Sequence, residues 1–211
     1  MKKREIPGSG YDNETKNRIL DEATKLFALN GFGAVSIRDI AKASETQTST
    51  IYYYYESKEF LLEDVLSRFE KDYRHYFEWL KGANMKADSL EELMDNMFNK
   101  EFLKMLDPMS CLGMSLAIKE HHHSASARKC FFELFLAHSI SYMQADFDNL
   151  AKKGVIPPSN TKIIAAIFMF CVMAGNDVRI HEYAGVKPPI DCSELYSDLK
   201  IFLTSALKKG V

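Results

Sequence analysis

The 211-residue sequence contains only four cysteines, and they are widely separated. Cys111, Cys130, Cys171 and Cys192 include no Cys-x-x-Cys pair, which argues against a zinc ribbon or a redox dithiol. We therefore expect reduced, mostly buried thiols, as in a cytosolic protein. A redox-sensing cysteine is the alternative.

An excess of positive charge is also missing. The chain has 27 Lys and Arg residues against 29 Asp and Glu, a formal net charge of −2. This balance argues against strong non-specific affinity for nucleic acid. Any attraction to DNA would come from local groups, namely the basic arm Lys2–Arg4 and the side chains of Arg38, Lys42 and Lys58.

Long hydrophobic runs are absent too. The longest apolar run, Ile163 to Gly175, is shorter than the roughly 20 residues that a membrane-spanning helix needs. The basic start Met1–Arg4 is followed by Pro7 and Gly8 and not by the apolar core of a signal peptide. We expect a cytoplasmic protein with no membrane association.

The sequence shows no sustained period-two alternation and no internal repeat, whereas helical apolar spacing recurs throughout. This pattern predicts an all-α fold of about nine helices. The expected helices cover about residues 14–30, a short stretch after Ser36, and residues 47–54, 58–81, 89–106, 109–122, 125–153, 160–183 and 192–208.

The most informative stretch runs from Ser36 to Lys58. Ile40 and Ala41 share the inner side of a short helix, and Ile51 and Tyr54 are expected to point inward from a second one. Two short helices that cross closely through a tight turn form a helix-turn-helix unit. The same unit also occurs in helical proteins that bind no DNA.

The outer face of the second helix carries hydrogen-bonding groups of a length that reaches base edges and phosphates in a major groove. The next helix begins after Ser57, where its first amides and Lys58 are suited to a phosphate. Ser36 is placed to cap the first short helix. The candidate DNA-contacting residues are Ser36, Arg38, Gln47, Thr48, Ser49, Thr50, Tyr52, Tyr53, Tyr54 and Lys58.

Four spaced segments, Ile19–Phe27, Asn30–Phe32, Val35–Ala41 and Thr50–Leu61, closely resemble the DNA-binding domain of the TetR (tetracycline repressor) family. The resemblance covers about residues 14–62 and is specific, because several elements match in order. The rest of the chain matches only in length and helical character. The resemblance implies a flexible basic arm (residues 1–13), a three-helix helix-turn-helix DNA-binding domain (14–57) and a C-terminal helical effector-binding and dimerisation domain (58–211).

The turn of the motif departs from the family pattern. The family usually has Gly at the position of Glu45. If the backbone there has a positive φ, a residue other than Gly costs roughly 1 kcal/mol. We expect tolerated strain or a slightly altered turn, which would affect how the recognition helix docks on DNA.

The helix expected at residues 160–183 is apolar all round, which is typical of a helix buried on every side. In a chain of this size one side can face the core and the other a second subunit, and residues 192–208 are also broadly apolar. We expect these two helices to form a four-helix interface in a homodimer, as the resemblance also implies. Two recognition helices about 34–36 Å apart would then fit a palindromic double-stranded DNA operator.

The middle helices are rich in Met, Phe and Tyr. Ordinary core packing is one explanation, and a cavity for an apolar or aromatic effector is the other; the resemblance favours the cavity. His138 and Tyr142, one helical turn apart, would supply polar groups, although His138 also fits a satisfied core histidine. The candidate pocket residues are Phe98, Phe102, Met114, Phe131, Phe135, His138, Tyr142, Phe168 and Met173.

Two short motifs suggest chemistry but lack the required setting. Consecutive residues on a helix point about 100° apart, so His121–His123 cannot converge on one metal ion. Gly113–Ala117 resembles a Gly-x-Ser-x-Gly nucleophile elbow, but that motif needs a strand before it, and here both flanks read as helix. We expect no enzyme activity, no metal and no cofactor.

The sequence therefore predicts a dimeric transcriptional regulator that represses and leaves its operator when a small apolar or aromatic effector binds. Movement of the helix at 58–81, which would contact both domains, is the expected link. The alternative is a helical ligand-binding dimer that has lost DNA binding, which the neutral N-terminal segment and Glu45 favour. An enzyme is the least supported class.

Overall fold

The computed structural model describes residues 10–98, 108–157, 160–187 and 191–209. Within these ranges every regular element is a helix, which confirms the predicted all-α fold. The elements are α1 (Gly10–Asn30), α2 (Ile37–Ala43), α3 (Thr48–Tyr54), α4 (Lys58–Asn84), α5 (Leu90–Met97), α7 (Pro108–Glu120), α8 (Ala125–Lys129), η1 (Cys130–His138), α9 (Ser139–Lys152), α10 (Thr161–Tyr183) and α11 (Cys192–Lys209).

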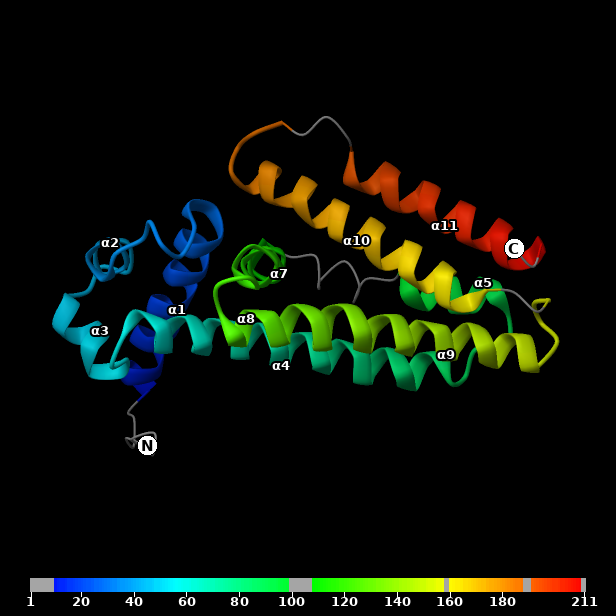
Figure 1. The fold of residues 1–211 in the computed structure, drawn as a ribbon, viewed down its shortest axis with the longest axis horizontal. Helices are drawn as coiled ribbons and strands as arrows, with labels where there is room; N and C mark the ends of the chain where they lie inside the picture. Colours follow the sequence, from blue (N-terminus) through cyan, green and yellow to red (C-terminus); the bar gives the residue numbers. More distant parts are fainter. Residues whose placement is uncertain (1–9, 99–107, 158–159, 188–190, 210–211) are drawn as a thin grey trace.

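The helices are arranged along one long helix, α4. Figure 1 shows α1, α2 and α3 gathered at one end of an elongated molecule, and α4 extending from this group beneath the remaining helices. The α8–η1–α9 helix runs alongside α4, and α10 packs against α7, α9 and α11. The buried face of α4 therefore contributes to both halves of the molecule, as expected.

Several predicted boundaries differ from the structure. α1 begins at Gly10 and not at the predicted Glu14. The helix-breaking pair Pro7-Gly8 lies before Gly10, so it does not prevent residues 10–13 from joining the helix. α5 ends at Met97, and the rest of the helix predicted to reach residue 106 lies outside the described residues. The helix predicted at 125–153 is continuous in direction but contains the π-helical segment η1, where the Ser139 hydroxyl donates to the Leu134 carbonyl five residues earlier.

α10 is more apolar along its whole length than its longest uninterrupted apolar run indicated. Its stretch Thr161–His181 is long and apolar enough to cross a membrane, judged by length and composition alone, with a mean hydropathy of 1.8. The sequence argument missed it because it counted only an uninterrupted apolar run. The core helix of a soluble protein passes the same test. α10 is not covered on every side by this chain, since Ile163, Ile167 and Phe170 are exposed along one face.

The N-terminal helices share a compact apolar core. Ile19 and Phe27 of α1, Ile40 of α2 and Ile51 of α3 are fully buried, as their spacing predicted. Tyr54 is only partly buried against this core. Tyr55, which follows α3, is buried instead, and its hydroxyl donates to Asp64 of α4 over 3.1 Å.

Polar contacts join this three-helix unit to the rest of the chain. The Lys119 ammonium donates to the Ala28 carbonyl over 2.7 Å, and the Phe32 amide donates to the Glu120 carboxylate over 3.1 Å. Arg68 of α4 forms an ion pair with Asp21 of α1. The end of α7 therefore contacts the N-terminal unit, in addition to the predicted contact through α4.

The two short motifs lie on α7 and in the turn after it. A Cβ atom at Gly113 would lie 2.9 Å from a ring carbon of Phe69, so this glycine lets α7 approach α4 closely. Ser115 is buried in the middle of α7, and the residues from Pro108 to Met114 before it are helical. His121–His123 lie in the turn that follows α7. Among the described residues no group of three His, Cys, Asp or Glu side chains is placed to hold a metal ion.

The turn between α2 and α3 closes with a left-handed residue. Glu45 has φ 51°, and no other non-glycine residue in the described chain has a positive φ. The Thr46 amide donates to the Ala41 carbonyl over 2.8 Å and the Glu45 amide to the Lys42 carbonyl over 3.3 Å, which is the Schellman pattern that ends a helix. The expected strain at Glu45 is therefore present, and the hydrogen bonds show that the turn keeps its ordinary geometry.

Replacing Glu45 with glycine should raise the free energy of unfolding by about 1 kcal/mol, because glycine adopts this backbone conformation without a Cβ clash. Urea unfolding of the full chain measures the change. Glu45→Ala is the matched control, since it removes the same charge but keeps the Cβ atom. Equal stability of the two variants would show that charge and not backbone strain is responsible.

Candidate DNA-binding interface and helical cavity

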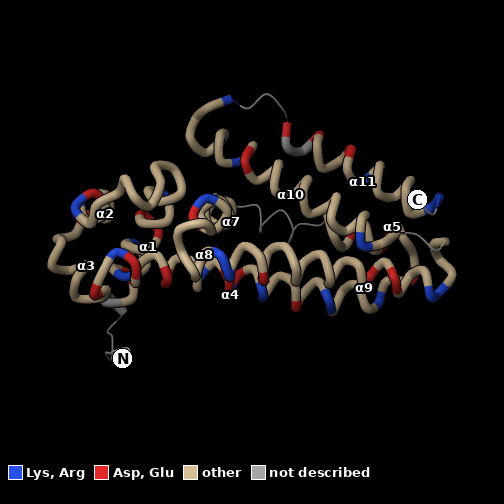
Figure 2. Tube along the Cα trace, viewed as in Figure 1, with Lys and Arg blue, Asp and Glu red and all other residues tan. Residues whose placement is uncertain are grey.

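α3 presents an uncharged polar surface to solvent. Gln47, at its N-cap, and Ser49 are exposed, and Tyr52 and Tyr53 are 57% and 56% exposed. Thr48 and Thr50 are half-buried on the flanks of the same helix. Figure 2 shows α3 without acidic or basic residues along its length. Such a surface offers hydrogen bonds and aromatic contact, whereas charge must come from neighbouring elements.

Ser36 holds the start of α2. Its hydroxyl accepts from the Asp39 amide over 3.2 Å and donates to the Asp39 carboxylate, which also accepts from the Ser36 amide over 2.8 Å. This confirms the predicted cap and adds the reciprocal half of a capping box. The hydrogen bond from the Ser36 hydroxyl also holds the pKa of Asp39 below its ordinary value. The Ser36 side chain is therefore already engaged within the protein.

Lys58 is engaged as well, although the sequence predicted a phosphate contact. Its ammonium donates to the carbonyls of Phe32 and Val35, both over 2.8 Å, and lies 4.2 Å from the centre of the Phe32 ring. These bonds tie the start of α4 to the loop before α2 and so position the helix-turn-helix unit. An ammonium group has three donors, so one remains for another acceptor.

Free positive charge next to α3 comes mainly from α2. Arg38 and Lys42 are exposed there, as the sequence suggested, but Glu45 and Glu56 are exposed at the two ends of α3. The basic arm Lys2–Arg4 lies outside the described residues. The described part of the interface therefore carries little net positive charge.

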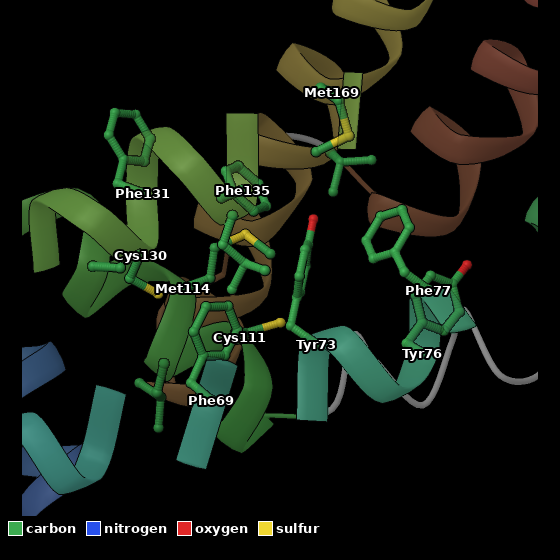
Figure 3. Close-up of a cluster of buried hydrophobic side chains, with 14 of the residues drawn as sticks. Phe69, Tyr73, Tyr76, Phe77, Cys111, Met114, Cys130, Phe131, Phe135 and Met169 are labelled. Carbon is green, nitrogen blue, oxygen red and sulfur yellow. The ribbon is translucent and has the colours of Figure 1, made fainter. Parts of the chain in front are cut away.

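A cavity opens between α4, α5, α9 and α10. Its closed volume is only about 10 Å³, and the surrounding space between atoms, about 290 Å³, includes open solvent. Figure 3 shows Tyr73, Tyr76 and Phe77 along α4 in the aromatic cluster of this region, with Met169 of α10 nearby. The lining is almost entirely apolar and consists of Tyr73, Tyr76, Phe77, Leu80, Met97, Met143, Phe168, Met169 and Val172.

Of the nine predicted pocket residues, Phe168 lines this cavity. Phe98 packs edge-on against Phe168 with ring centres 5.5 Å apart, and His138 and Tyr142 pack against Phe77, at 5.8 and 5.3 Å. The others do not line it: Met114, Phe131 and Phe135 are core residues, Met173 packs against the core, and Phe102 lies outside the described residues. The sequence argument overlooked the α4 aromatics because it assigned that helix to packing between domains.

Polar side chains lie just beyond one end of the cavity. The Asn84 amide donates to the Asp146 carboxylate over 2.5 Å, one helical turn past the lining residues Leu80 and Met143. Burial raises the pKa of Asp146 to about 6, and the hydrogen bond from Asn84 only partly offsets this effect. Burial likewise raises the pKa of the Tyr142 hydroxyl. The cavity therefore has an apolar body with hydrogen-bonding groups at one end.

The fold and the exposed polar helix define a helix-turn-helix protein with a helical C-terminal domain. Residues 19–65 match the family model of "Bacterial regulatory proteins, tetR family". The chain is 33% identical over 78 residues to YttP of Bacillus subtilis (strain 168), a probable HTH-type transcriptional regulator. This match covers 37% of this chain and 37% of YttP. It is 35% identical over 57 residues to the HTH-type transcriptional repressor KstR2 of Rhodococcus jostii (strain RHA1), covering 27% and 28% of the two chains.

A solved structure shares the whole fold. The transcriptional regulator FadR from Bacillus subtilis, in complex with stearoyl-CoA, superposes with a TM-score of 0.62 at 16% identity, covering 90% of this chain and 97% of FadR. The N-terminal region of the chain therefore matches the tetR family of bacterial regulatory proteins, and the fold as a whole resembles that of FadR. The sequence matches span only about a third of the length of YttP and KstR2.

Lys58→Ala should lower the free energy of unfolding by about 1–3 kcal/mol, because two backbone carbonyls lose a charged donor. Chemical denaturation of the full chain measures this. Lys42→Ala, which removes an exposed lysine of α2, is the control and should change stability by less than about 0.5 kcal/mol. Equal effects of the two substitutions would contradict the positioning role of Lys58.

Proposed function

We propose that this protein is a dimeric, sequence-specific DNA-binding transcriptional regulator that represses until a small effector binds. The observation that carries the proposal is the uncharged face of α3, with Tyr52 and Tyr53 exposed on a capped helix-turn-helix unit. A helix of this kind reads base edges by hydrogen bonds and contact, since it has no charge to attract phosphates indiscriminately. The match of residues 19–65 to the tetR family model supports the same function.

In the proposed complex Thr48, Thr50, Tyr52 and Tyr53 face the major groove. Arg38 and the remaining donor of Lys58 are the candidates for phosphate contact, with Ser36 and Tyr54 nearby. Because the described interface has little net positive charge, we expect a shallow dependence of affinity on salt concentration. Such a protein would act in the cytoplasm, where its operator is.

The proposed dimer forms through the exposed faces of α10 and α11. Ile163, Ile167 and Phe170 follow one another at helical spacing on α10, and Ile201 and Phe202 are exposed on α11. Exposed apolar residues in contiguous rows mark association surfaces. Pairing of α10 and α11 with their copies would bury both rows and place two α3 helices on successive turns of a palindrome.

Effector binding in the cavity is the proposed switch. The cavity is lined by α4 residues, and α4 carries Lys58 and Arg68, which hold the N-terminal unit. α7 offers a second connection through Lys119 and Glu120. An effector that favours one arrangement of α4 would therefore change the separation of the two α3 helices. KstR2 is named a repressor, and FadR was solved with stearoyl-CoA, which agrees with repression and with an effector in this fold.

The proposal is tested by selection from random DNA duplexes at two salt concentrations, followed by sequencing of the retained pool. We expect a palindrome whose half-sites lie about one helical turn apart. If no sequence is enriched at either salt concentration, the protein is instead a helical ligand-binding dimer without DNA binding, which Glu45 and the balanced charge of the interface would then explain.

Replacing Tyr53 with alanine should lower affinity for the selected palindrome by roughly tenfold to a hundredfold and relax the sequence preference at one position of each half-site. Fluorescence anisotropy on the selected duplex and on its single-base variants measures both effects. Phe132→Ala removes an equally exposed aromatic side chain from η1 and should change neither. Unchanged discrimination in Tyr53→Ala would remove this residue from the interface.

Phe170→Glu should convert the dimer to a monomer, because a charged side chain would be placed in the centre of the proposed interface. Phe170 is 60% exposed on the isolated chain, so folding should be unaffected. Analytical ultracentrifugation gives the mass, and Phe132→Glu is the matched control. A dimer that survives Phe170→Glu would place the interface elsewhere.

A further inference from the structure

Two buried polar atoms without a hydrogen-bond partner lie just beyond the lining of the cavity, close to the carboxylate of Asp146. Asn84 is 3% exposed and uses its amide nitrogen to donate to Asp146, but its side-chain carbonyl oxygen is buried and has no partner. The hydroxyl of Tyr142 is also buried without a partner. Buried polar atoms are almost always satisfied in native proteins, and leaving one unpaired costs free energy.

These groups adjoin the aromatic lining. Tyr142 lies one turn before Asp146 on α9, and its ring centre is 5.3 Å from that of Phe77, a lining residue. Asn84 follows Leu80 on the buried face of α4, and Asp146 follows Met143 on α9. A molecule whose body contacts Tyr76 and Phe77 would therefore reach the carboxylate by extending about one helical turn beyond the lining.

The Asp146 carboxylate has no cationic partner in the described part of the chain. It accepts a hydrogen bond from the neutral amide of Asn84, whereas Lys153, just after the end of α9, pairs with Asp88. A buried carboxylate without a cation is energetically unfavourable, which is consistent with its raised pKa of about 6. At neutral pH it is mostly ionised, so the end of the cavity is negative as well as rich in acceptors.

We propose that the cavity binds a protonated amine with an apolar or aromatic body. The ammonium N–H groups donate to the Asp146 carboxylate, the Asn84 carbonyl oxygen and the Tyr142 hydroxyl, and the body packs among the aromatic side chains of α4. An ammonium group supplies three donors and a positive charge, which matches three acceptors and one negative charge. A carboxylate or phosphate ligand would meet like charge, and a neutral apolar ligand would leave the acceptors unpaired.

This inference rests on the proposed function only in one respect, namely that the bound amine is taken to be the effector. Ligand binding is therefore measured without DNA, on the full-length protein. Trp79, the one tryptophan of the chain, stacks on the cavity residue Tyr76 with ring centres 6.2 Å apart, so its fluorescence reports on the site. Isothermal titration calorimetry gives the affinity independently.

Three probes separate charge, hydrogen bonding and shape. 2-Phenylethylammonium has the charge and the N–H donors, its N,N,N-trimethyl derivative has the charge alone, and 2-phenylethanol has a similar body without charge. We expect the primary ammonium to bind at least tenfold more tightly than the alcohol and more tightly than the trimethyl derivative. Equal affinity for the ammonium and the alcohol would overturn the proposal.

Asp146→Asn removes the charge with little change of shape and should weaken binding of 2-phenylethylammonium at least tenfold, while binding of 2-phenylethanol changes little. Asp72→Asn makes the same change on the exposed face of α4 and should leave both affinities unaltered. If circular dichroism shows that Asp146→Asn is unfolded, Tyr142→Phe takes its place, with an expected loss of at least threefold for the ammonium alone. Unchanged ammonium affinity in the folded variant would overturn the proposal.

Failure of this inference and failure of the proposed function are distinguishable. A protein that selects a palindrome but does not prefer the ammonium probe keeps its DNA-binding function and overturns the amine site. A protein that prefers the ammonium probe and depends on Asp146, but selects no DNA sequence, supports the amine site and overturns the regulatory function.

Discussion

The burial of one face of α4 is the interaction on which the rest of the structure depends. From Leu61 and Leu62 to Phe77 and Leu80 this face lies in the core, first under the three N-terminal helices and then under the C-terminal ones. Burial of aliphatic and aromatic side chains contributes roughly 1.5–3 kcal/mol each, so neither half of the molecule can separate from α4 without a large loss of stability. The helix-turn-helix unit and the cavity therefore share one rigid element.

That shared element explains how a small molecule could influence a surface far from it. The aromatic residues that line the cavity belong to the same helix as Lys58 and Arg68, which hold the loop before α2 and the surface of α1. A packed helix moves as a body, so a shift at Phe77 is passed on to the first turn of α4. The additional contact through the end of α7 constrains the direction of such a shift, because α1 is held from two sides.

The sequence predicted the fold well, because apolar spacing and helix caps are local signals. The cap at Ser36 and the inward Ile40 and Ile51 follow from residues close in sequence. The cavity was predicted poorly because its walls come from four helices, and a Phe or Met at helical spacing looks the same in a core and in a pocket. The engagement of Lys58 was also missed, since its acceptors are carbonyls more than twenty residues away. The π-helical geometry of η1 has no signature that spacing can show.

Besides the side-chain contacts Arg68–Asp21 and Tyr55–Asp64, three side chains join the two halves through main-chain atoms. Lys58 and Lys119 donate to main-chain carbonyls, and Glu120 accepts from a main-chain amide. In each of these bonds only one partner is a side chain. Ala28, Phe32 and Val35 take part through main-chain atoms, which every residue has except for the amide hydrogen that proline lacks. During evolution those three positions can drift without breaking the bonds, and no compensating change is required of Lys58, Lys119 or Glu120. Pairwise covariation between homologous sequences would therefore not reveal these three contacts, although they help to hold the helix-turn-helix unit in place.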